Sequence, residues 1–76
     1  MNKLEKAKEI IKANISRGGL GIFDSRNMVG DSMKTIFSHD DLTIDICESW
    51  RYFEVFGLTD EEFIKLHNYY NELLNY

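Results

Sequence analysis

The side chains with the greatest chemical potential are one cysteine, two histidines and a group of carboxylates. Cys47 could act as a nucleophile, and His39, Asp40 and Asp41 could begin a metal site. Neighbouring strand residues point to opposite faces, so these three side chains do not converge easily on one ion, and a polar hairpin turn is favoured. No sequence around Cys47 resembles a cysteine-enzyme motif. We therefore expect no catalytic residue, no metal, no cofactor and no enzymatic activity.

A glycine-rich run at residues 18–21 superficially suggests a phosphate-binding loop. It lacks the Lys-Ser/Thr pair of a P-loop, and it follows a predicted helix instead of opening one. The run is therefore interpreted as a helix end followed by a turn.

Residues 24–33 are rich in Asp, Asn, Ser and Gly, a composition typical of a loop. Arg26 could hold a carboxylate or phosphate with two parallel hydrogen bonds, beside Asn27 and Asp31. In the alternative interpretation, Asp24, Asn27 and Asp31 only make turn bonds to the backbone. Arg26, Asn27 and Asp31 remain loop candidates for a binding role.

Aromatic and acidic side chains alternate in the second half of the chain. Trp and Tyr are enriched at the centres of protein interfaces, and carboxylates suit a basic partner. Ordinary packing under a helix or loop is the competing interpretation. The candidate partner-binding residues are Asp40, Asp41, Asp45, Glu48, Trp50, Tyr52 and Glu54.

Two helices are predicted to frame the chain. Residues 2–17 have apolar residues at helical spacing and end at Gly18 and Gly19. The second helix begins after Thr59, whose side chain and Glu62 form the pattern of a capping box. Apolar residues at 63, 66, 70 and 73 form its buried face.

Strands are predicted between the helices, at residues 20–23, 34–38, 42–48 and 50–56. In the last strand the core side is assigned to Phe53 and Val55, which leaves Trp50, Tyr52 and Glu54 on the outer face next to Asp45. The opposite register would bury Glu54, at a cost of several kcal/mol if the carboxylate is unpaired. The expected fold is α+β: an N-terminal helix, a three- to four-stranded antiparallel meander and a C-terminal helix, with both helices on one face.

The length of 76 residues predicts one domain, residues 1–76. A single cysteine and a polar N-terminus favour a cytoplasmic protein, and no stretch is long and apolar enough for a membrane span. Small domains often gain stability by self-association, so a homodimer is possible.

Charge is distributed unevenly along the chain. Residues 1–17 hold five Lys/Arg and two Asp/Glu, whereas residues 18–76 hold four and eleven. Eight carboxylates and a single arginine lie between Asp40 and Glu62. This excess of acid disfavours direct binding of nucleic acid and favours a basic protein partner.

Three segments carry a resemblance to a known group of proteins: residues 26–31 (RNMVGD), 43–47 (TIDIC) and 52–59 (YFEVFGLT). They resemble short uncharacterised proteins of phages and mobile elements from low-GC Gram-positive bacteria, over roughly residues 20–70. In size and charge such proteins are similar to anti-CRISPR inhibitors. The resemblance implies a host defence protein as partner, one that itself binds nucleic acid in a basic groove.

The leading hypothesis is thus an inhibitor that blocks a defence effector, most specifically a CRISPR nuclease complex, through the acidic and aromatic residues. One alternative is a homodimeric DNA-binding regulator that uses Lys3, Lys6, Lys8 and Lys12 of the first helix. The other is a binder of a nucleotide signal that uses the 24–33 loop.

Overall fold

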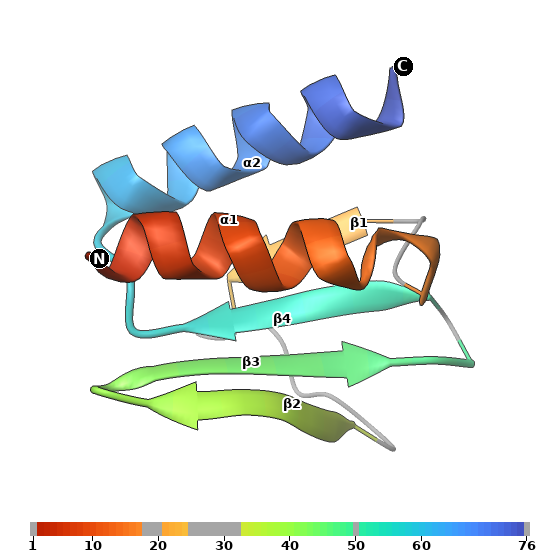
Figure 1. Cartoon of the computed structure of the whole chain (residues 1–76), viewed down its shortest axis with the longest axis horizontal. Coiled ribbons are helices and arrows are strands. Elements are labelled where there is room, and N and C mark those ends of the chain that lie inside the picture. The colour runs from red at the N-terminus through yellow and green to blue at the C-terminus, as the bar shows by residue number, and fades with distance from the viewer. Residues whose placement is uncertain (1, 18–20, 25–32, 50, 76) are drawn as a thin grey trace.

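The computed structural model of the chain describes residues 2–17, 21–24, 33–49 and 51–75, with Phe23 and Asp24 described by their backbone alone. The described elements follow the predicted order. They are α1 (Lys3–Ala13), a short 3-10 turn η1 (Ile15–Arg17), β1 (Gly21–Asp24), β2 (Lys34–His39), β3 (Leu42–Cys47), β4 (Tyr52–Phe56) and α2 (Asp60–Leu74). Figure 1 shows both helices on the same face of one sheet, so the predicted α+β fold is confirmed.

The sheet has the strand order β1-β4-β3-β2 and is mixed. β2 pairs antiparallel with β3, and β3 pairs antiparallel with β4. β1 pairs parallel with β4, so the prediction of a purely antiparallel meander is wrong for this strand. Nine residues separate β1 from β2, too many for a tight hairpin, and β1 takes the opposite edge of the sheet.

A tight turn joins β2 to β3. Asp40 and Asp41 have φ angles of 52° and 62°, the left-handed values that a two-residue type I′ turn requires. Aspartate tolerates this region better than most residues. The predicted polar hairpin turn is therefore confirmed, and it holds both carboxylates at one end of the sheet.

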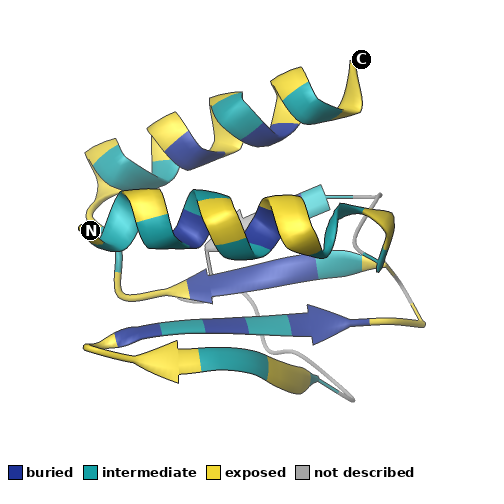
Figure 2. Ribbon diagram, viewed as in Figure 1, coloured by how far each residue is buried: buried dark blue, intermediate teal, exposed yellow. Residues whose placement is uncertain are grey.

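The core lies between the sheet and the two helices (Figure 2). Phe53 and Val55 of β4 face it, as the sequence predicted, and Phe53 packs edge-to-face on Tyr70 of α2 with ring centroids 6.0 Å apart. Tyr70 also forms a hydrogen bond with the backbone of Gly21, which ties α2 to β1. The completely or nearly buried apolar residues are Ala7, Ile11, Ile22, Leu42, Ile44, Ile46, Cys47, Phe53, Val55, Leu66 and Tyr70.

Both helices begin at a side-chain cap. The Asn2 carboxamide oxygen accepts a hydrogen bond from the Glu5 backbone at 2.8 Å. In α2 the Thr59 hydroxyl accepts from the Glu62 backbone at 3.1 Å, and the Thr59 backbone donates to the Glu62 carboxylate at 3.0 Å. The predicted capping box is confirmed. Neither described helix is long and apolar enough to cross a membrane.

Candidate partner-binding surface

The structure distributes the predicted partner-binding residues over three separate places. Asp40 and Asp41 are exposed in the β2–β3 turn, at one end of the sheet. Glu48 is exposed beyond the opposite end of β3. The remaining three described residues, Asp45, Tyr52 and Glu54, lie on the sheet face away from the helices. Trp50 and the loop candidates Arg26, Asn27 and Asp31 lie outside the described residues.

Glu54 stands on the predicted face, but the expectation that this places it at the surface is wrong. Its residue is only 5% exposed, on an inner strand flanked by β1 and β3. Asp45 lies directly across from it on β3, where its carboxylate accepts a hydrogen bond from the Thr35 hydroxyl at 2.7 Å. Among the described residues, the Glu54 Oε1 atom has no hydrogen-bond partner.

Burial, and secondly the negative charge of Asp45, raise the pKa of Glu54. Both effects disfavour the ionised carboxylate, the first by desolvation and the second by repulsion. In this conformation Glu54 offers a partner little accessible area.

Glu48 lies in a different electrostatic setting from the other candidates. Its carboxylate accepts a hydrogen bond from the Arg17 guanidinium at 2.9 Å, and this bond and the arginine charge lower its pKa. A second arginine, Arg51, donates to the Ser16 carbonyl at 2.9 Å in the same region. The two arginines offset the charge of Glu48, so this end of the sheet is not an acidic surface.

A larger group of carboxylates gathers at the end of the molecule that carries the β2–β3 turn. α2 begins at the same end (Figure 1). Gly57, directly after β4, has a φ of 107° and packs so closely on the Asp41 carbonyl that no Cβ would fit. The link into α2 is therefore held against the turn. We call this group the acidic end; it consists of Asp40, Asp41, Asp60, Glu61 and Glu62.

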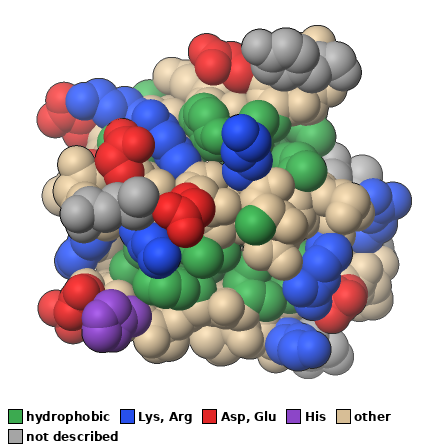
Figure 3. All heavy atoms as spheres, in the orientation of Figure 1, with side chains coloured by type: hydrophobic (Ala, Val, Ile, Leu, Met, Phe, Trp, Pro, Cys, Tyr) green, Lys and Arg blue, Asp and Glu red, His purple; other side chains and the backbone are tan. Residues whose placement is uncertain are grey.

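The acidic end combines two rigid supports. Asp40 and Asp41 are fixed by a tight turn, and the other three carboxylates occupy the first turn of α2, where the helix dipole favours negative charge. Hydrogen bonding to the Thr59 backbone lowers the pKa of Glu62, with smaller contributions from the Thr59 hydroxyl and nearby lysines. Lys3 lies between the two supports and donates to the Gly57 carbonyl at 3.4 Å. Figure 3 shows acidic and basic side chains interspersed over the visible face.

Sequence reasoning found only part of this group. It assigned Glu62 to the cap of the helix, which is correct, and did not join the carboxylates at the start of α2 to Asp40 and Asp41. The signal that could have joined them is Gly57, the single residue between β4 and the capping segment that can adopt its φ without strain.

The lysines of α1 do not form one continuous basic face. Lys6 lies over the Phe37 ring at 5.6 Å from its centroid, and Lys8 lies over the Tyr69 ring at 5.4 Å. Lys3 turns towards Gly57. These lysines contact three different neighbours, an arrangement that fits poorly with a row of phosphates along one nucleic acid strand.

Chemistry of other kinds finds little support among the described residues. No group of three or more His, Cys, Asp or Glu in the described ranges could hold a metal ion. Cys47 is buried, with its sulfur 3.5 Å from the Ser49 hydroxyl oxygen. His67 stacks on Phe63 at the surface of α2, with ring centroids 6.3 Å apart. Comparison with protein families, with curated proteins and with solved structures finds no match to the chain.

Proposed function

We propose that this protein is a non-catalytic inhibitor of phage or mobile-element origin that binds a bacterial defence protein in the host cytoplasm. In its most specific form, the partner is a CRISPR nuclease complex whose basic groove normally holds nucleic acid. The resemblance of residues 26–31, 43–47 and 52–59 to phage and mobile-element proteins supports the class of protein. The net charge of −4 supports a basic partner.

The observation that carries the proposal is the acidic end. Its carboxylates stand on a tight turn and on a capped helix start, so their backbone is already fixed and little backbone freedom is lost on binding. Carboxylates on such a backbone can occupy positions that phosphates take in a basic groove, and they steer association through long-range attraction. The acidic end thus replaces the broader surface that the sequence predicted.

The test is a plaque assay in bacteria that carry a CRISPR system of known type and a spacer against the infecting phage. Production of the protein is expected to restore plaques for one or a few CRISPR types. A phage without the target sequence should form equal plaques with and without the protein. If the protein restores plaques against no type in a panel, the CRISPR assignment is overturned.

The surface is tested with the triple variant Asp40→Asn, Asp41→Asn and Glu61→Gln. Asparagine adopts left-handed φ as readily as aspartate, so the turn keeps its shape, and the capping residue Glu62 is untouched. We expect at least about a tenfold loss of inhibition, equivalent to roughly 1.4 kcal/mol. The matched control removes three carboxylates elsewhere, by Glu9→Gln, Glu48→Gln and Glu72→Gln, and should keep full activity. Equal loss in both variants would show that net charge and not the acidic end is recognised.

A further inference from the structure

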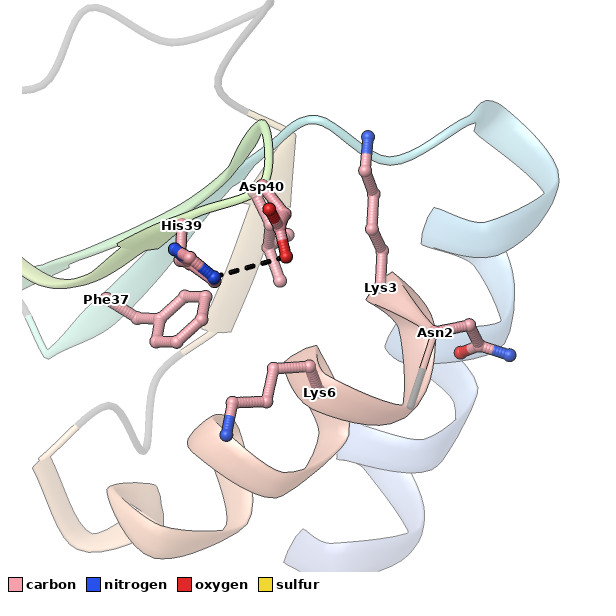
Figure 4. A pocket seen from close by; sticks show the side chains of 7 residues that line it. Asn2, Lys3, Lys6, Phe37, His39 and Asp40 are labelled. Carbon is pink, nitrogen blue, oxygen red and sulfur yellow. Dashed lines mark ion pairs between the residues drawn. The ribbon is translucent and has the colours of Figure 1, made fainter.

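A hollow lies between α1 and the β2–β3 hairpin. Its volume is about 240 Å³. α1 contributes Asn2, Lys3 and Lys6, and the hairpin contributes Phe37, His39, Asp40 and Leu42. Figure 4 shows the aromatic rings of the hairpin on one side of the hollow and the helix on the other.

The polar groups around the hollow are predominantly cationic. The ammonium groups of Lys3 and Lys6 extend towards opposite ends of it (Figure 4). Asp40 contributes one negative charge, and its carboxylate lies 3.2 Å from the His39 ring nitrogen. The first turn of α1 adds the positive end of a helix dipole, with one of its amides already taken by the Asn2 side chain. The balance of charge favours an anion.

The interior of the hollow is apolar and aromatic. Leu42 is 1% exposed and forms part of its lining, and Phe37 presents a half-buried ring. A small inorganic anion would use the lysines and leave these surfaces unused. A ligand with both an anionic group and a planar ring would use both, because a ring can stack on Phe37.

Lys6 can change partners at little cost when such a ligand arrives. Its ammonium lies over the Phe37 ring and 3.5 Å from the exposed Glu9 carboxylate. An exposed ion pair and an exposed cation–π contact each contribute only about 0.5–1 kcal/mol. The ammonium can therefore move from the ring to an anionic group of the ligand, while the ring of the ligand takes its place.

We propose that this hollow is a binding site for a nucleoside monophosphate, with the base stacked on Phe37 and the phosphate held by Lys6. The volume lies below the roughly 300–1,000 Å³ of pockets that enclose drug-sized ligands, which suits one nucleotide with its phosphate at the rim. Asp40 lines the hollow and also belongs to the acidic end, but nucleotide binding through Lys6 and Phe37 does not depend on the proposed inhibitor function.

The experiment is an NMR titration of the ¹⁵N-labelled full chain with AMP and UMP, with adenosine and inorganic phosphate as comparison ligands. The nucleotide should cause saturable shifts of the Lys3, Lys6, Phe37 and His39 amides. It should bind at least about fivefold more tightly than adenosine or phosphate, since stacking and the phosphate each contribute. The absence of saturable shifts at millimolar nucleotide, or equal binding of inorganic phosphate, would overturn the site.

Two variants locate the binding groups. Lys6→Met keeps the apolar stem and removes the charge, and Phe37→Leu removes the ring; each should weaken AMP binding about fivefold or more. Lys12→Met is the control, because Lys12 is exposed on the same helix and does not line the hollow. The amide spectrum of each variant shows whether it is folded. Unchanged affinity in folded Lys6→Met would refute the assignment even if Phe37→Leu proved unstable.

Discussion

At the scale of single residues, Glu54 is a carboxylate whose buried environment disfavours its charge. The residue is 5% exposed, and Asp45 stands directly across on β3. The Oε1 atom of Glu54 has no hydrogen-bond partner in the part of the chain that the structure describes. A buried acceptor without a partner costs about 1–3 kcal/mol. The fold tolerates this cost because Phe53 and Val55, on either side of Glu54 in β4, are both buried in the core.

The substitution Glu54→Gln should stabilise the protein at neutral pH. The raised pKa of Glu54 means that the folded state binds its proton more tightly than the unfolded state does. The stability that comes from this tighter proton binding is therefore complete below the pKa of Glu54 in the unfolded state. It is lost as the pH rises through the pKa of Glu54 in the folded state. Glutamine stays neutral, so we expect a gain on the order of 1 kcal/mol at pH 7 that shrinks towards zero in acid.

Urea unfolding of both proteins between pH 4 and pH 8 measures this difference. Asp45→Asn is the control for the repulsion between the two carboxylates alone. Asparagine keeps an oxygen that can accept the hydrogen bond from Thr35, and Asp45 is only partly buried. A gain that is the same at every pH would mean that glutamine improves packing or hydrogen bonding, and that the titration of Glu54 has no part in it.

At the scale of elements, the start of α2 is the most completely determined piece of the fold. Thr59→Ala removes the hydroxyl that accepts from the Glu62 backbone, and we expect a loss of about 1 kcal/mol in the free energy of unfolding. Thr59→Ser keeps the hydroxyl and should lose much less. Thermal unfolding followed by circular dichroism compares the three proteins, and equal melting temperatures for alanine and serine would contradict a role for the cap.

The difference between local and long-range contacts explains which elements could be predicted. The cap of α2, the turn at Asp40 and the core side of β4 depend on neighbours in the sequence, and all three predictions are confirmed. The parallel pairing of β1 with β4 joins residues about thirty positions apart, such as Ile22 and Phe53, and no local pattern encodes it. Burial of Glu54 and assembly of the acidic end depend on that same long-range arrangement, so alternation along one strand could not predict them.

At the scale of the whole molecule, one core joins every layer. Ile11 of α1, Ile22 of β1, Ile44 of β3, Phe53 of β4 and Leu66 of α2 are all at most 4% exposed and belong to a single cluster. A chain of 76 residues has a total stability of only about 4–11 kcal/mol. No helix can therefore lose its packing while the sheet keeps its own, because the same side chains stabilise both.

A conservative change in one helix should consequently weaken the whole domain to the same extent. Ile11→Val removes one buried methyl group, and we expect a loss of about 1 kcal/mol, with Leu66→Ala losing about 2–5 kcal/mol. Amide signals of α1, α2, β3 and β4, followed by NMR through a urea titration, should disappear at a common midpoint that moves down together in each variant. Separate midpoints for helices and strands would mean that the two layers unfold independently. The acidic end, which spans the β2–β3 turn and α2, would then lose its fixed geometry before the sheet unfolds.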